Sequence, residues 1–432
     1  MAHSHSHVAP PPLTPEAKAQ QRRALRIMLL TLIPLAVWTI GGLIMLWPTN
    51  TAAHVKSDIS TYSVAGLQIP TGRIVEAQPI PCDGLTGSTQ AGGADQQQTC
   101  GKVKVLMLDG PEAGQEIPEI TMTAPVYSSG VQIGQNIKLF RVPMEGAPPA
   151  YQFAEFERTA PLIVFAIIFA AVVILVAQPR RGIAALLGLV FSLLMMAYFI
   201  FPALISGSNP IMVGLIGCSA IMFVVLYATH GFSARTTAAL LGTLFGLLIV
   251  AVLGYVAVSW AHLTGVAAED DVQLAASAPD MKMTSVVLCG MIIAGLGVLN
   301  DVTITQASAV WEIAGGGETR TSVLFRRGMR IGRDHIASTV YTIVFAYAGT
   351  ALATLLMLSV YNRPMLETIQ TEMFATEILS SLVGAIGLVL AVPLTTAISA
   401  AVVGASQRNR GEISLRTDGG GGGLRGDALV DR

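Results

Sequence analysis

Charged side chains are scarce in this sequence of 432 residues. Asp, Glu, Lys and Arg make up 12% of it, about half the share in soluble domains, whereas 52% is hydrophobic. A phosphate-binding loop of the form GxxxxGK followed by Ser or Thr is also lacking, so we do not expect ATP-driven work by this chain alone. An HExxH motif and a repeat of 20 to 50 residues are lacking as well. The composition predicts an integral membrane protein.

Long hydrophobic runs predict where the chain crosses the membrane, since a spanning helix needs roughly 20 residues. The first run follows a basic cluster and is too long for a cleaved signal peptide, so we interpret it as a signal anchor. We expect an α-helical membrane bundle of about eight transmembrane helices, at residues 25–47, 161–177, 183–201, 211–229, 236–260, 284–314, 336–360 and 380–405.

The arginines predict the orientation, because short cytoplasmic loops carry an excess of positive charge. With the N-terminus inside, the cytoplasmic connections hold Arg180, Arg181, Arg235 and the five arginines of 320–333. The short outside loops hold only Lys282 and Arg363 among several acids. We therefore expect both termini in the cytoplasm, which requires an even number of spans.

Residues 48–159 differ from the rest, because short alternating runs separated by Gly and Pro are typical of strands and turns. Strands are expected at 72–79, 101–108, 115–123, 135–142 and 151–156, with Asp109 and Gly110 in a hairpin turn. They predict a small extracytoplasmic β-barrel, closed or nearly closed, of OB-like or SH3-like type. The resulting domains are a disordered cytoplasmic tail (1–24), the first helix (25–47), the β domain (48–159), a seven-helix bundle (160–405) and a flexible cytoplasmic tail (406–432).

The four cysteines agree with this plan. Cys82 and Cys100 share the outside segment, where a disulfide can persist, and Cys218 and Cys289 lie within spans. We expect a Cys82–Cys100 bridge, which would contribute about 3 kcal/mol on the chain-entropy model.

One hydrophobic segment, TSVVLCGMIIAGLGVLNDVTITQASAVWEIA at 284–314, has an acid in its middle. Its unbroken apolar run is too short to span, so Asn300 and Asp301 must lie within the membrane. Helical spacing places a stripe on one face, small at one end and polar at the other: Gly290, Ala294, Gly297, Asp301, Thr305, Ser308 and Glu312. Because an acid facing lipid is costly, we expect this stripe to face other helices or water.

The next segment, TSVLFRRGMRIGRDH, places Arg326, Arg330 and Arg333 on one helical face, which suits anionic lipid head groups at the inner leaflet. Asp334 is expected as the N-cap of the seventh span. Small and polar stripes in the seventh and eighth spans, including Thr342 and Thr395, predict contact faces for the central helix.

Two phrases, GLGVLNDVTITQASAVWEI and GMRIGRDHIASTVYTIVFAYAGT, resemble the most recognisable segments of the YibE/F family of bacterial multi-span membrane proteins. The resemblance implies the same architecture and a location in the bacterial plasma membrane. Asp301, Glu312, Arg333 and Asp334 are the charged residues that match the family's segments. The resemblance assigns no catalytic role to them.

Three classes of function remain open. The first is a transporter or channel for a small solute or ion, with Asp301 as the proton or cation site. The second is a scaffold or sensor whose outside β domain binds a partner. An intramembrane aspartyl protease is disfavoured, because it needs two acids that share a proton and only Asp301 lies clearly within a span.

Asp301 also has a purely structural interpretation, as an acid hydrogen-bonded to Thr342 or to an arginine near the inner face. The sequence predicts no enzyme activity, cofactor, metal site or nucleic-acid partner. The histidines of the N-terminal tail, His3, His5 and His7, have no Cys or acidic partner nearby and are interpreted as part of a solvated tail.

Overall fold

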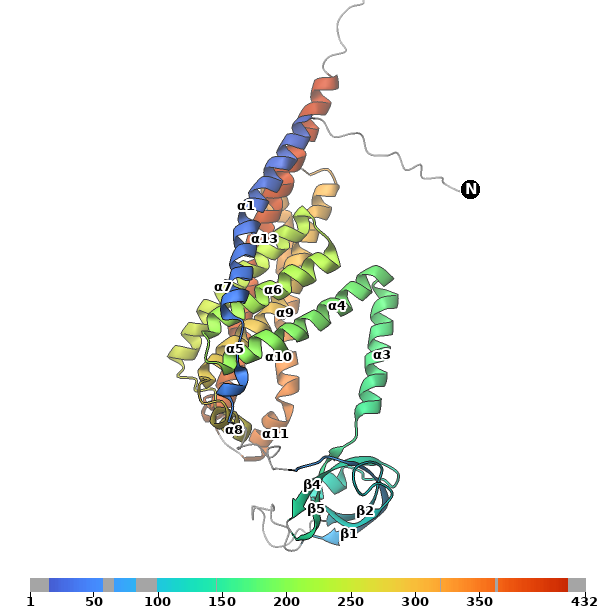
Figure 1. The fold of residues 1–432 in the computed structure, drawn as a ribbon. Coiled ribbons are helices and arrows are strands. Elements are labelled where there is room, and N and C mark those ends of the chain that lie inside the picture. The colour runs from blue at the N-terminus through green and yellow to red at the C-terminus, as the bar shows by residue number, and fades with distance from the viewer. Residues whose placement is uncertain are drawn as a thin grey trace, which may run out of the picture. The chain divides into compact units, whose positions relative to one another are not determined.

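The computed structural model describes residues 15–56, 66–82, 99–144, 146–318, 320–361 and 364–418 (Figure 1). The chain divides into two compact units, one of Lys56–Val176 and one of Met1–Val55 with Ala177–Arg432. His3, His5 and His7 lie outside the described residues.

The first unit contains the predicted β domain. Its strands are β1 (Thr71–Pro81), β2 (Thr99–Met107), β3 (Glu116–Met122), β4 (Asn136–Met144) and β5 (Ala147–Phe156). A short helix, α2 (Ala124–Ser128), follows β3, and a long one, α3 (Thr159–Val176), follows β5. All five expected strands are present, and Gly110 has a positive φ of 84° in the β2–β3 turn, as the Asp-Gly pair predicted.

The sheet is not closed into a barrel, so the closed form of the prediction, a closed or nearly closed barrel, is wrong. The strands form one antiparallel sheet in the order β3-β2-β1-β4-β5, and in the described residues β3 and β5 are its two edges. Alternation along a strand shows which side chains are buried, among them Ile74, Val105 and Leu139. The alternation does not show whether the edge strands β3 and β5 pair, and pairing of the edges is what closes a barrel.

The second unit is helical and begins with α1 (Pro15–Leu46) and the short η1 (Thr51–His54). Beyond α3 come α4 (Pro179–Met195), the π-helical η3 (Met196–Ile200), α5 (Phe201–Ile205), α6 (Pro210–His230), α7 (Ala234–Trp260), α8 (Glu269–Ser277), α9 (Met283–Gly315), α10 (Thr321–Thr350), α11 (Leu352–Tyr361), α12 (Met365–Ile369) and α13 (Glu372–Asp418).

Six helices in the described parts of both units are long and apolar enough to cross a membrane: α3, α4 continued to Ile205, α6, α7, α9, and α13 as far as Gly404. The expected number was eight. The apolar part of α1, Leu30–Leu46, is shorter than these six. The expected seventh span is divided, because α10 ends at Thr350 and α11 begins only at Leu352.

Three other expectations differ from the structure. Asp334 is not an N-cap, because α10 already begins at Thr321 and runs through this position. Helix α1 begins at Pro15, within the tail expected to be disordered, and α13 continues to Asp418. Good helix-forming residues such as Glu16, Ala17 and Lys18 let a helix extend beyond its apolar part.

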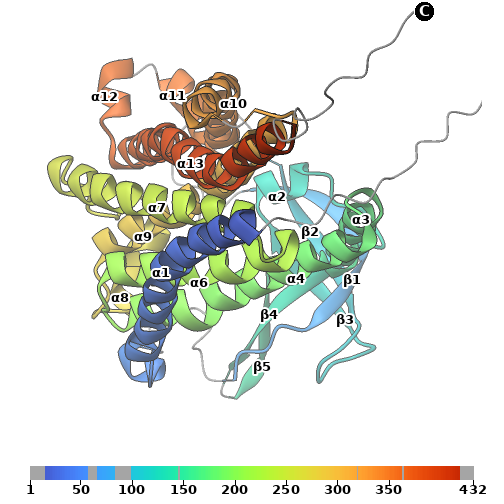
Figure 2. The ribbon, with the colours of Figure 1, turned by 90° about the horizontal axis from the view of Figure 1, so that it is seen from above.

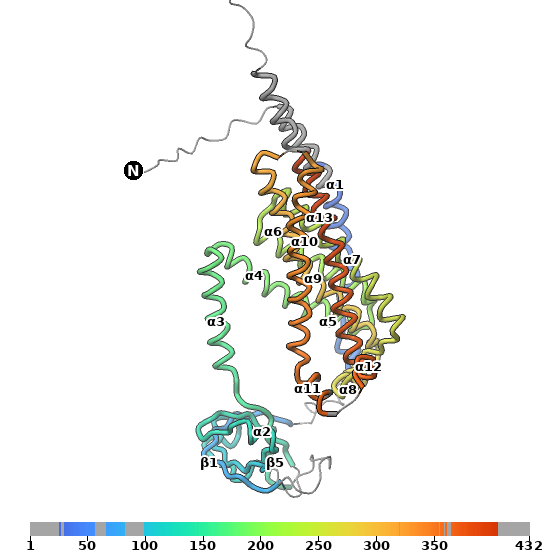
Figure 3. The backbone as a smooth tube through the Cα atoms, turned by 180° about the vertical axis from the view of Figure 1, so that it is seen from behind, coloured from blue at the N-terminus to red at the C-terminus, as the bar shows by residue number. Residues whose placement is uncertain are grey.

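Helix α9 lies at the centre of the second unit and packs against α6, α7, α10 and α13. Figure 2 shows α13 beside α7 and α10, and from behind α9, α10 and α13 run side by side (Figure 3). Glycines permit these close approaches, as small residues do between membrane helices. At Gly246 of α7, a Cβ would lie 2.6 Å from the side chain of Leu299 on α9.

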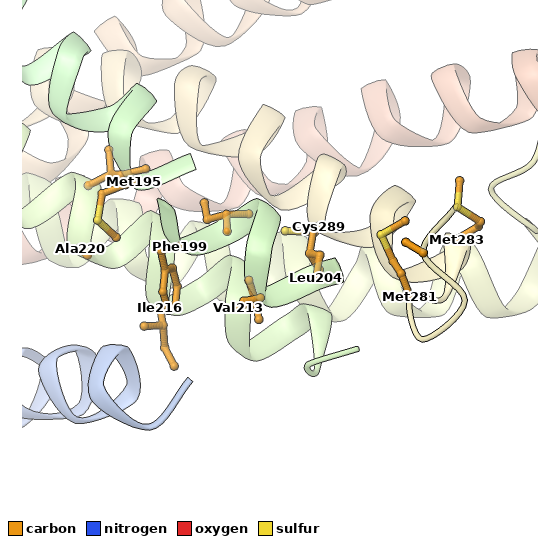
Figure 4. Packing of buried hydrophobic residues seen from close by; sticks show 13 residues of the cluster. Met195, Phe199, Leu204, Val213, Ile216, Ala220, Met281, Met283 and Cys289 are labelled. Carbon is orange, nitrogen blue, oxygen red and sulfur yellow. The ribbon is translucent and has the colours of Figure 1, made fainter. Parts of the chain in front are cut away.

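The π-helical turn η3 contributes to a second contact. It buries Phe199 and Ile200 against α6, where a Cβ on Gly217 would lie 2.8 Å from Ile200. Figure 4 shows Phe199 close to Ile216 of α6, with Cys289 of α9 in the same hydrophobic cluster. Cys218 and Cys289 are buried free thiols within candidate spans, as expected.

Candidate functional site

The two sides of α9 carry different polar residues, and the predicted stripe lies on the exposed side. Asp301 and Glu312 are exposed, and Thr305 and Ser308 are half-buried. A Cβ on Gly290 or on Gly297 would meet no atom within 4 Å. Of the two expected surroundings of this stripe, other helices or water, the described helices of its own unit do not cover Asp301, Glu312, Gly290 or Gly297.

Asp301 itself lies near the middle of α9. Its main-chain carbonyl accepts a hydrogen bond of 2.8 Å from Thr305 Oγ1, one turn further on. In the described part of the chain, no ion pair or side-chain hydrogen bond reaches its carboxylate, and Thr342 Oγ1 instead donates to the carbonyl of Ser338 at 3.2 Å. The structural interpretation of Asp301, with Thr342 as its partner, is not supported.

The buried side of α9 carries a polar residue that the sequence interpretation missed. Gln306 is fully buried, and its Nε2 donates to the carbonyl of Gly328 on α10 at 2.8 Å and to Thr396 Oγ1 on α13 at 2.7 Å. Gln306 thereby links three helices. It lies next to Thr305 in sequence but faces the opposite way, on a second helical pattern that includes Leu299, Thr303 and Val310.

Two glycines of α10 make room for Gln306. Gly328 and Gly332 are four residues apart, in the small-xxx-small spacing that brings membrane helices together. A Cβ on Gly332 would lie 2.6 Å from Val392 and 3.1 Å from both amide atoms of Gln306. The sequence GMRIG contains this signal within a segment that is also rich in arginine.

A second hydrogen bond joins α9 to α7, between Thr303 Oγ1 and Thr243 Oγ1 at 2.6 Å. Both threonines are fully buried. Gln306 Oε1, Asn300 Oδ1 and Ser399 Oγ are among the buried atoms that have no hydrogen-bond partner within the described residues. Uncharged polar groups thus occupy the interior of the described bundle around α9, and the predicted acids lie on its outer side.

Arg333 and Asp334 are exposed on α10. No hydrogen bond or ion pair in the described residues joins them to Asp301 or Glu312, so the structure does not bring the predicted charged residues into one cluster. Arg333 instead lines a groove between α10 and α13.

The sheet unit contains the predicted disulfide. Cys82 and Cys100 are bonded, with their Cα atoms 5.1 Å apart. Residues 83–98, which the bridge encloses, lie outside the described residues. The bridge ties the end of β1 to the start of β2.

An ion pair also crosses this unit. Arg141 on β4 binds Glu112 in the β2–β3 turn through both Nη2 and Nε, at 2.7 Å and 2.9 Å. The hydrogen bonds from Arg141 lower the pKa of the Glu112 carboxyl below its usual value. These contacts fix the β2–β3 turn against β4.

Together these features define a multi-span helical membrane protein with a separate antiparallel sheet. A family model for YibE/F-like proteins matches residues 165–405, more than half of the chain, and the chain belongs to this family. The match begins within α3 and does not include the sheet. Searches of curated proteins and of solved structures found no match.

Proposed function

We propose that this protein is a transporter or channel for a small solute or ion, in which Asp301 binds a proton or a cation. The observation that carries the proposal is the exposed carboxylate near the middle of α9, a helix of 33 residues that can span the bilayer. An ionisable residue at such a depth is costly in lipid, and such residues commonly mark ion and substrate pathways.

The surroundings of Asp301 fit this role. The side chain is exposed, so in this proposal no described helix has to move for a proton or a solute to reach it. Thr305 and Ser308 add hydroxyl groups toward one end of the same face, and Gly290 and Gly297 leave open space toward the other. In this proposal the face of α9 that carries Asp301 lines the path, and the buried face around Gln306 holds the bundle together.

The proposed topology has eight crossings. To the six candidate spans it adds the apolar part of α1 and the divided segment α10–α11. The protein then lies in the bacterial plasma membrane. Both termini are cytoplasmic and the sheet unit is outside the cell membrane, as the arginine distribution predicts. The interruption at Ala351 is compatible with transport, because discontinuous helices recur in transporters.

A scaffold or sensor is the second candidate, favoured by the sheet unit. The sheet has two edge strands, β3 and β5, that pair with no further strand in the described residues, and an exposed edge can add a strand from a partner. In this alternative the helices only anchor the sheet, and Asp301 has no part in the activity. We do not propose enzymatic catalysis, since a carboxylate dyad would need a second acid beside Asp301.

Asp301→Asn tests the choice between these candidates. The purified protein is reconstituted into vesicles that contain a pH-sensitive dye, and a proton or cation gradient is imposed. We expect the native protein to change the internal pH, and Asp301→Asn to slow this change at least about tenfold, because Asn cannot bind and release a proton.

Glu312→Gln is the matched control, because it removes an exposed acid from the same face near the end of α9. It should retain most of the flux. Equal flux through the native protein and Asp301→Asn would contradict the assignment of Asp301, and no flux above protein-free vesicles for any gradient would favour the scaffold.

A further inference from the structure

A groove runs between α10 and α13. It has a volume of about 870 Å³, within the usual range for small-molecule sites. Six residues of α10 and two of α13 line it: Thr321, Ser322, Phe325, Arg326, Met329, Arg333, Ala397 and Ala400.

The lining combines positive charge with an apolar floor. Arg326 and Arg333 supply two guanidinium groups, and no carboxylate is among the lining residues. In the described chain neither arginine forms an ion pair. Phe325 and Met329 add apolar side chains to the same lining, so the groove complements a molecule that has both an anionic group and an apolar part.

The position of the groove in the fold indicates what kind of molecule binds in it. Ala397 and Ala400 lie near the end of the candidate span of α13, which ends at Gly404. Thr321 is the first residue of α10, and the positive end of the helix dipole adds to the attraction for an anion there. The groove is therefore at the level where a spanning helix leaves the hydrocarbon region and phosphate head groups begin.

We infer that the groove between α10 and α13 binds an anionic phospholipid, with its phosphate on Arg326 and Arg333 and the upper part of an acyl chain over Phe325 and Met329. A soluble anion would use the arginines but not the apolar floor. The helical spacing grouped Arg330 with Arg326 and Arg333, but only Arg326 and Arg333 line the groove. A diffuse attraction of lipid to the basic helix would use all its arginines equally, including Arg327 and Arg330, which are exposed on α10 outside the groove. This inference does not depend on the proposed role of Asp301.

The test compares two double variants of the full chain that remove the same charge from the same helix. The protein is purified in detergent with phosphatidylglycerol or phosphatidylcholine, and retained lipid is measured by native mass spectrometry. We expect the native protein to retain one phosphatidylglycerol in preference to phosphatidylcholine. Arg326→Gln with Arg333→Gln should weaken retention about twenty-five-fold, because each arginine contributes roughly a factor of five. Arg327→Gln with Arg330→Gln should leave it nearly unchanged.

A third variant distinguishes binding of a lipid from binding of a free phosphate. It also tests the inference if the arginine double variant does not fold. Ala397 is exposed in the groove, so Ala397→Phe fills the space for the acyl chain while keeping both arginines. It should weaken retention of phosphatidylglycerol. Equal losses in the two double variants would overturn the inference in favour of a diffuse basic surface. Unchanged retention in Ala397→Phe, with displacement by inorganic phosphate, would overturn it in favour of a soluble anion.

Discussion

The two sides of α9 show how one membrane helix carries polar residues for different purposes. On the buried side, Gln306 and Thr303 are uncharged and bonded to neighbouring helices. On the exposed side, Asp301 and Glu312 are ionisable and have no ion-pair partner in the described residues. Buried polar groups are tolerated when they are hydrogen-bonded, whereas an unpaired charge would cost far more there. The interior polar residues therefore serve packing, and the exposed acid is available for another role.

The largest difference in stability between the two sides of α9 should come from replacing a glycine with a larger residue. Gly332 packs against Val392 and Gln306, so Gly332→Val overpacks the junction of three helices and should destabilise the protein by about 1–3 kcal/mol. Gly297→Val adds the same side chain to the exposed face of α9, where nothing lies within 4 Å, and should have little effect. The melting temperature of each variant is measured by heating the protein in detergent and using gel filtration to determine how much folded protein remains.

The outcome also tests whether the exposed face is free in the protein as it is purified. If Gly297→Val lowers the melting temperature as much as Gly332→Val does, then that face is covered and the contrast between the two sides fails.

A smaller effect is expected from removing the amide of Gln306. Gln306→Met keeps the length of the side chain but loses the bonds to the Gly328 carbonyl and Thr396 Oγ1. Interhelical hydrogen bonds in membranes average about 0.6 kcal/mol each, so we expect a loss of about 1 kcal/mol. Thr305→Val, one residue away on the exposed side, breaks only a bond within α9 and is the matched control. Equal melting temperatures for Gln306→Met and the native protein would contradict the interpretation of Gln306 as a link between three helices.

The sequence predicted where the helices and strands lie better than it predicted which side of a helix is buried or which strands pair. Strand alternation located all five strands, and long apolar runs located the six candidate spans, because these patterns depend on neighbours along the chain. Closure of the sheet depends on contacts between β3 and β5, which no local pattern encodes.

For a similar reason, the sequence left open which side of α9 packs against other helices. Small and polar residues are suited both to helix packing and to a water-accessible path, so the stripe through Asp301 fitted either use. The decisive observation is that Gly328 and Gly332 of α10 lie against Gln306. That contact joins residues far apart in the chain, and the spacing within α9 alone could not show which face receives it.

The smallest effect on stability should come from Asp301→Asn. Its carboxylate is exposed and has no partner in the described chain, and substitutions at such positions usually change stability by about 0.5 kcal/mol or less. The melting temperature in detergent should therefore match that of the native protein, while ion flux in vesicles falls. A fall in melting temperature as large as that of Gln306→Met would show that Asp301 has a structural partner. The loss of flux would then report damage to the fold, and the contrast between a packing side and a functional side of α9 would no longer hold.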